Sequence, residues 1–255
     1  MLAARIVQVL TGLAIIIAMA AGLFAITSIS VGPLDPEPAP NVSTNKKTIA
    51  EILPRSQEHN FVPPIPGTYQ LASIKPAADG SVIGIDGKSV SLMQRMKGKI
   101  TVLSFIYTLC SDAKGCPLAM ATLFETHDAS KFFPEIAENA RFISLSFDPL
   151  RDTPEAMESY AYPVLADPQA NTKIPWEFLT TKSVDQLKPI LKAYGQVINP
   201  SVDGETIAHL LRLYLIDKKG VVRNIYGLGF LDPRLLFADI KTLLMEEKSA
   251  DGSPS

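Results

Sequence analysis

The sequence has few of the residues that bind metals or form covalent cross-links. Two cysteines and three histidines occur in 255 residues. These numbers exclude a disulfide-dense scaffold, a four-cysteine zinc ribbon and a multi-haem protein. An excess of one charge is also absent, since 24 Lys and Arg side chains are balanced by 26 Asp and Glu side chains. The composition therefore gives no electrostatic footprint for nucleic acid, and any metal or redox chemistry must use very few residues.

Apolar side chains are in excess, and the excess is concentrated at the N-terminus. Hydrophobic residues make up 47% of the chain, charged residues 20%, and the mean hydropathy is +0.17. No charged side chain occurs from Ile6 to Leu34, and the apolar part of this run reaches Val31. A bilayer needs about 20 apolar residues as a helix, so the length favours a transmembrane anchor over residues 1–31. The alternative is a signal peptide, for which Ala18-Met19-Ala20 offers a small-x-small site.

Under both interpretations, the rest of the chain is exported across the membrane. Arg5 precedes the apolar run, and Asp35 and Glu37 follow it, so the positive-inside bias keeps the N-terminus in the cytoplasm. We therefore expect a single-pass protein of a bacterial inner membrane with its C-terminal domain in the periplasm. Residues 32–66 contain eight of the 20 prolines, which predicts an extended linker with one short helix near Thr48–Leu53. The polar tail, 248–255, is predicted to be disordered.

Residues 67–247 alternate between strand and helix patterns. Continuous β-branched and aromatic runs predict strands buried on both faces at Lys99–Thr108, which should be central, and at Arg141–Phe147. Further elements are predicted as a hairpin of Ser81–Ile85 and Lys88–Leu92 around Asp86-Gly87, helices at Leu118–Asp128, from Thr153-Pro154 onward and at Val184–Tyr194, strands at Leu211–Ile216 and Val221–Ile225, and a last helix at Pro233–Met245. This order indicates an α/β domain with a central sheet covered by helices.

The two cysteines are the first candidates for chemistry. Cys116 is followed by Pro117, which is favoured at the first helical position. Cys116 is therefore predicted at or beside a helix N-cap, where N–H groups and the helix dipole stabilise a thiolate and lower the pKa. Cys110 lies at the end of the preceding strand, and Gly115 permits a tight turn between the two cysteines. The pair can form a disulfide or bind one soft metal ion; an inert disulfide that staples a loop is the structural alternative.

The histidines and one methionine are the other soft or titratable candidates. His209 precedes a predicted buried strand, but a lone histidine is more often hydrogen-bonded than a ligand. His127, near the exposed end of a helix, and His59, in the linker, are expected to be bystanders. Met120 would face the same side of its helix as Cys116, although a core-facing methionine is the simpler interpretation.

Five sequence blocks occur together in one order. They are LSFIYT before the first cysteine, Cys-Pro at a helix start, SFDPLRDTPE, WEFLT and IAHLLRLYLIDKKG. As a set, over about Gly67–Leu244, they resemble the Sco/SenC proteins, which are membrane-anchored, thioredoxin-like copper chaperones that help to assemble the binuclear copper centre of cytochrome c oxidase. The resemblance implies a thioredoxin-like central mixed sheet flanked by helices. It also implies that Cys110, Cys116 and His209 bind one copper ion per domain, and that the cysteines exchange between dithiol and disulfide; two thiolates and an imidazole suit Cu(I) or Cu(II).

The sequence departs from the family pattern between the cysteines. The family has three residues there, whereas Ser111–Gly115 makes five. The longer loop removes any fixed i, i+4 relation between the sulfurs, which leaves copper affinity open while disulfide formation remains possible. By resemblance, Asp148 and Asp152 lie near the site, although turn formation and helix capping are their simpler roles.

Four functions follow from these residues. The favoured one is a copper-binding assembly factor that delivers copper to, or prepares the thiols of, a respiratory copper site such as that of cytochrome c oxidase. Other exported copper proteins and periplasmic copper or thiol carriers are further expected partners. The alternative is a periplasmic thiol-disulfide oxidoreductase without stable copper binding, in which Cys110 or Cys116 attacks and the other resolves.

The two remaining functions are a thiol peroxidase and a redox-inert interaction domain. A thiol peroxidase is disfavoured because such sites have a Thr three residues before the reactive cysteine, where this chain has Tyr107 and Ala113. A redox-inert domain would tolerate replacement of both cysteines.

Overall fold

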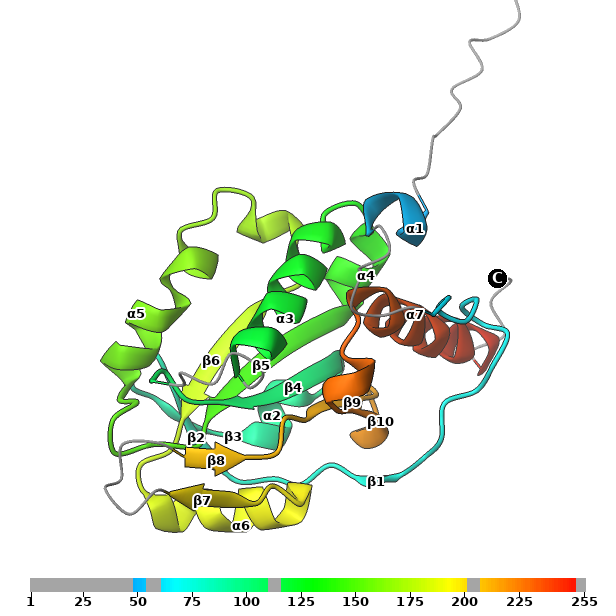
Figure 1. Cartoon of the computed structure of the whole chain (residues 1–255). Helices are drawn as coiled ribbons and strands as arrows, with labels where there is room; N and C mark the ends of the chain where they lie inside the picture. Colours follow the sequence, from blue (N-terminus) through cyan, green and yellow to red (C-terminus); the bar gives the residue numbers. More distant parts are fainter. Residues whose placement is uncertain (1–47, 54–60, 110–115, 201–206, 251–255) are drawn as a thin grey trace, which may run out of the picture. The chain divides into compact units, whose positions relative to one another are not determined.

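The computed structural model describes residues 48–53, 61–109, 116–200 and 207–250. These residues form a central eight-stranded mixed sheet with helices packed against it (Figure 1). In order across the sheet, the strands are β1 (Lys75–Pro76), β10 (Val221–Tyr226), β9 (Leu213–Ile216), β4 (Ile100–Ile106), β5 (Ala140–Ser146), β6 (Trp176–Thr180), β2 (Ser81–Gly84) and β3 (Ser89–Ser91). The predicted α/β domain with a central sheet is confirmed.

The helices alternate with the strands along the chain. They are α1 (Ile49–Ile52), α2 (Leu92–Met96), α3 (Cys116–Ser130), α4 (Pro134–Asn139), α5 (Pro154–Leu165), α6 (Val184–Tyr194) and α7 (Pro233–Ala250), with short 3-10 turns η1 (Ala170–Thr172) and η2 (Leu228–Phe230). The predicted anchor, residues 1–31, lies outside the described residues. Within the described ranges no helix is long and apolar enough to cross a membrane.

The predicted central strand is β4, and all seven of its residues are buried. It pairs in parallel with β5 along its whole length and antiparallel with β9. β5 also pairs in parallel with β6. A continuous apolar run forms such a strand because helices cover both faces, so neither face needs polar side chains.

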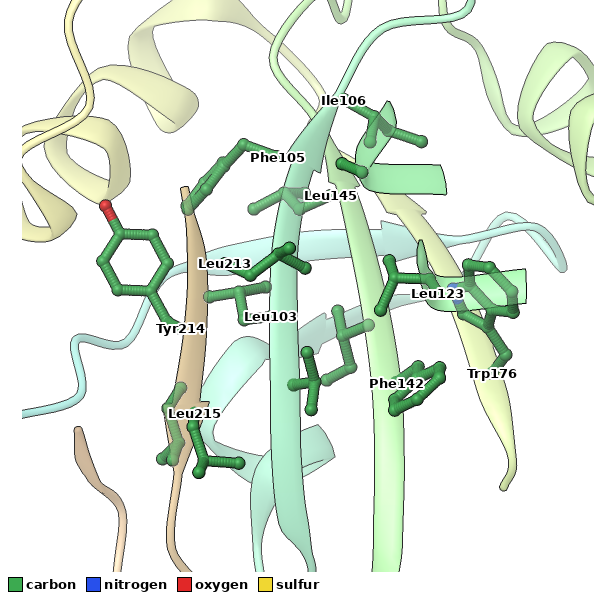
Figure 2. Close-up of a cluster of buried hydrophobic side chains, with 14 of the residues drawn as sticks. Leu103, Phe105, Ile106, Leu123, Phe142, Leu145, Trp176, Leu213, Tyr214 and Leu215 are labelled. Carbon is green, nitrogen blue, oxygen red and sulfur yellow. The ribbon is translucent and has the colours of Figure 1, made fainter. Parts of the chain in front are cut away.

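Two helices show how the faces are covered. Leu123 of α3 and Trp176 of β6 lie on one side of the strands in Figure 2, and Phe105 and Tyr214 lie on the other. Tyr194, the last residue of α6, packs against this second pair, with ring centroids 5.5 Å from Phe105 and 5.1 Å from Tyr214. The core is therefore two layers of side chains, one on each face of β4.

Local sequence signals set several element boundaries. Thr153 caps α5, since its hydroxyl accepts the N–H of Ala156, and Pro154 opens the helix as predicted. Gly87 has a φ of +72° in the β2–β3 hairpin, a conformation that glycine adopts without a steric penalty. The last helix is longer than predicted, because α7 continues to Ala250.

Part of the Pro-rich linker is folded onto the domain. The short helix predicted near Thr48–Leu53 is α1, whose capping box pairs Thr48 with Glu51. Leu53 is buried in the core, and the carbonyl of Phe61 accepts a hydrogen bond from Arg234 Nη2 of α7 at 3.3 Å. The predicted short helix is therefore confirmed, and the described parts of the linker contact α7.

Candidate functional site

One edge of the sheet gathers the segments that carry the predicted site residues. β4 and β5 are parallel and end together, with Ile106 opposite Ser146. β9 is antiparallel to β4, so its first residue, Leu213, lies near the end of β4 opposite Ser104. The residues that follow β4 and β5 and those that precede β9 therefore meet at this edge.

His209 belongs to a small second sheet rather than to the loop before β9. This sheet pairs β7 (Ile198–Pro200) with β8 (Ile207–His209) in antiparallel register (Figure 1). The half-buried ring of His209 packs on Phe147 at a centroid distance of 4.7 Å and lies edge-on to Tyr107 at 5.9 Å. His209 is therefore held between the ends of β4 and β5.

The orientation of the His209 ring is also fixed by a hydrogen bond. Its Nδ1 lies 3.1 Å from the carbonyl oxygen of Ile207. A carbonyl can only accept, so Nδ1 is the donor in this contact. Metal-binding histidines are commonly oriented in this way, with the other ring nitrogen donating to a carbonyl or carboxylate.

Tyr107 connects β8 to the main sheet. It follows β4 and is 3% exposed. Its hydroxyl accepts the backbone N–H of Ile207 at 3.4 Å, and its ring packs on Phe147 at 5.0 Å. Sequence reasoning misses Tyr107 and Phe147 as parts of this site. Both lie at the C-terminal ends of predicted buried strands, Lys99–Thr108 and Arg141–Phe147, and this position is the signal that could identify them.

The helix that begins at Cys116 confirms the prediction from Cys-Pro. α3 starts at this residue, and Pro117 is its exposed second residue. A helix N-terminus presents N–H groups that stabilise negative charge. Cys110, with residues 111–115, lies outside the described residues. The chain is described up to Leu109 and again from Cys116, so the ligand set of Cys110, Cys116 and His209 stays a prediction.

The two aspartates after β5 differ in their roles. Asp148 forms the turn, because its backbone carbonyl accepts the N–H groups of Arg151 and Asp152 and its carboxylate pairs with Arg151. Asp152 does not cap α5, since Thr153 does. Its carboxylate is 1% exposed and accepts hydrogen bonds from Thr108 and Ser146. The capping role considered for Asp152 is therefore wrong, and its contacts point toward the end of β4.

A second grouping of possible ligands lies away from this edge. Among the described residues, His127, Asp128 and Asp167 bring ligand atoms within 4.8 Å of one another. The ammonium group of Lys173 forms ion pairs with both carboxylates. A protein cation therefore already bridges the two carboxylates, which makes the cluster a structural ion-pair network rather than a metal site.

The prediction that His127 lies at the exposed end of a helix is wrong. His127 is 3% exposed, because α3 continues to Ser130 and its last turn packs on Trp176, with ring centroids 5.6 Å apart. Burial, with Lys173 nearby, lowers the pKa of His127 to about 4. Met120 is buried in the core, as predicted.

Several large, exposed apolar side chains follow strands that end at this edge of the sheet. Leu109 follows β4, Leu150 follows β5, Leu210 follows β8, and Leu228 and Phe230 follow β10. These five side chains are between 48% and 78% exposed, and we call them the apolar rim. Tyr226, the last residue of β10, pairs with Leu213, so all the rim segments leave the same edge of the sheet. Exposed apolar side chains that share an edge with a candidate site are a feature of protein interaction sites.

Both the sequence and the fold of the chain resemble those of known proteins. The family model described as SCO1/SenC matches residues 81–245. Among curated proteins, none matches the sequence significantly.

Solved structures of Sco proteins share the fold. ScoI of Arabidopsis thaliana with copper bound is 22% identical, with a TM-score of 0.54, covering 67% of this chain and 98% of that one. A SCO1/SenC family lipoprotein from Bacillus anthracis is 24% identical, with a TM-score of 0.55, covering 67% and 95%. BsSco, described with a disulfide switch and as a member of the Sco family of cytochrome c oxidase assembly proteins, is 25% identical, with a TM-score of 0.53, covering 69% and 98%. The predicted thioredoxin-like fold is thus confirmed.

Proposed function

Because the chain belongs to the SCO1/SenC family, we propose that it is a copper-binding assembly factor that delivers copper to, or prepares the thiols of, a respiratory copper site such as that of cytochrome c oxidase. In this proposal copper is the cargo, and one ion is held by Cys110, Cys116 and His209. Two thiolates select a soft metal, and an imidazole completes a set that accommodates both oxidation states of copper.

The observation that supports the proposal most directly is the orientation of His209. Its Nδ1–H donates to the carbonyl of Ile207, and its ring packs on Phe147. With Nδ1 engaged in this way, Nε2 is the ring nitrogen that would bind the metal in this proposal.

The structural relatives support the same chemistry. ScoI of Arabidopsis thaliana is described with copper bound, and BsSco is described with a disulfide switch and in the context of oxidase assembly. We extend both properties to this chain: the reduced cysteines bind copper, and a two-electron oxidant such as a partner's disulfide, which is itself reduced to two thiols, converts them to a disulfide that no longer offers thiolate ligands.

The apolar rim supports a protein as the receiver of copper. Metal transfer requires the receiving ligands to reach the metal, so the partner must cover this edge of the sheet. Exposed apolar side chains favour such contact because their burial releases water. We propose that the partner is the copper-site subunit of a respiratory oxidase, or another exported copper protein, at the periplasmic face of a bacterial inner membrane. The uncharged run Ile6–Leu34 and the lipoprotein relative support this location.

Copper binding to the full-length, reduced chain in detergent tests the proposal. Stoichiometry and affinity would be measured by competition with a copper(I) chelator for the wild type and for Cys110→Ala, Cys116→Ala and His209→Ala. His59→Ala is the matched control, since it removes a histidine from the linker. We expect one tightly bound ion, lost in the first three variants and retained in the control.

Binding that is absent, or that does not depend on His209, would overturn the proposal. If the cysteines then form a reducible disulfide with a defined potential, the thiol-disulfide oxidoreductase without stable copper binding is the function instead.

A further inference from the structure

Asp152 is a buried carboxylate tied to the residue that lies two positions before Cys110. The hydroxyl of Thr108 donates to Asp152 Oδ1 at 2.5 Å, and the N–H of Thr108 donates to Oδ2 at 3.2 Å. The hydroxyl of Ser146 also donates to Oδ2, at 2.5 Å. Removing an ionised carboxylate from water is costly, and three donors compensate for that cost.

Asp152 is needed neither to cap α5 nor to form the turn after β5. Thr153 caps α5, and the turn after β5 is formed through the carbonyl of Asp148. The contacts of Asp152 instead reach across the sheet to the residue that follows Tyr107. The carboxylate therefore holds the end of β4 rather than the start of α5.

Consecutive residues at the end of β4 are thus fixed to two different parts of the site. Tyr107 accepts the N–H of Ile207 in β8, the strand that carries His209. Thr108 donates its backbone N–H and its hydroxyl hydrogen to the carboxylate of Asp152, in the turn between β5 and α5. The strand that carries His209 and the start of the segment between the cysteines therefore share one anchor, the end of β4.

We propose that Thr108 and Asp152 form a positioning pair that fixes where the cysteine segment leaves β4, relative to His209. Three ligands from separate segments bind one ion tightly only if the backbone holds them near the coordination geometry. Five residues separate the cysteines instead of the three of the family pattern, so the point where this segment leaves β4 is what the described fold can set. The expected effect on copper binding rests on the proposed function. The expected effect on disulfide formation does not.

Thr108→Val tests the pair, since valine keeps the shape and the N–H but removes the hydroxyl donor. Thr108→Ser restores the hydroxyl. Thr242→Val is the matched control, because it removes a buried hydroxyl in α7. We expect Thr108→Val to weaken copper(I) binding by about 10- to 100-fold, as outer-shell changes commonly do, with Thr108→Ser and Thr242→Val near the wild type. Asp152→Asn, which keeps one acceptor oxygen, is the second variant and should show an intermediate loss.

A second measurement is independent of copper. Oxidised glutathione converts the two cysteine thiols to one disulfide; the thiols lose two electrons and two protons, which yield two molecules of glutathione. The intramolecular step depends on how often one sulfur meets the other, so Thr108→Val should slow it by roughly three- to tenfold. Thermal unfolding of each variant shows whether it is folded at the temperature of the assay.

The outcomes separate the two proposals. If Thr108→Val matches Thr242→Val in both measurements, or Thr108→Ser fails to restore them, the positioning pair is refuted. If the wild type binds no copper, the proposed function fails, and the rate of disulfide formation alone decides whether Thr108 and Asp152 position the cysteine segment.

Discussion

Acid should destabilise this protein through one buried histidine. His127 is 3% exposed and packs on Trp176. Burial disfavours its charged form and the ammonium of Lys173 repels it, while Asp128 and Asp167 act in the opposite direction. The net result is a pKa of about 4 in the folded protein, against 6.5 for an unperturbed histidine.

The sign of the effect follows from proton binding. The folded pKa is below the unfolded one, so between pH 6.5 and pH 4 the unfolded chain binds more protons than the folded chain. The free energy of unfolding therefore falls as the pH falls through this window. A difference of this size in pKa corresponds to a loss of about 3 kcal/mol once both states are titrated.

Urea unfolding at a series of pH values would measure this loss, and Trp176, the single tryptophan, is the fluorescent probe. His127→Asn keeps a polar side chain of similar size that does not titrate. The free energy of unfolding of the wild type should fall relative to that of His127→Asn by about 3 kcal/mol between pH 7.5 and pH 4. Parallel pH profiles for the two proteins would show that His127 is not the acid-sensitive group.

Three further changes test other parts of the fold. Asp239→Ala leaves the donors of Tyr69, Asn224 and Tyr226 without their shared acceptor, so urea unfolding should show a loss of about 3 kcal/mol or more; a loss below 1 kcal/mol would mean that water replaces the carboxylate. Thr153→Ala removes the cap of α5 and should cost about 1 kcal/mol by the same assay, whereas Thr153→Ser should cost little. Lys173→Met removes the cation between Asp128 and Asp167 and should raise the pKa of His127, as measured by NMR titration; an unchanged pKa would contradict the assigned repulsion.

Much of the fold is predictable because its signals are local. The apolar run of β4 requires burial on both faces, and Thr153-Pro154 gives the start of α5. β6 is different: Trp176–Thr180 is only five residues long, and it becomes a strand because it pairs with β5. β8 likewise depends on pairing with β7, so the sequence alone indicates only that His209 precedes a strand.

Of the candidate site, only the reactive residues can be predicted from the sequence. Cys116 is identified by the proline that follows it, and the start of α3 agrees. The contacts around the site join residues that are distant in sequence. Tyr107 contacts Ile207, and Asp152 contacts Thr108. No local pattern encodes these contacts, because they depend on the order of strands in the sheet. The buried position of His127 has the same cause, since it depends on Trp176 of β6.

The packing of the linker on α7 sets a limit on how far the domain can move from its predicted anchor. With α1 and Phe61 held on the domain, only residues 32–47 separate that anchor from the folded body. At about 3.4 Å per residue, their greatest span is about 55 Å, against about 120 Å for the whole stretch 32–66. The volume that the candidate site can search around the predicted anchor is then roughly tenfold smaller, so the proposed partner, if held in the same membrane, would be met at a correspondingly higher local concentration.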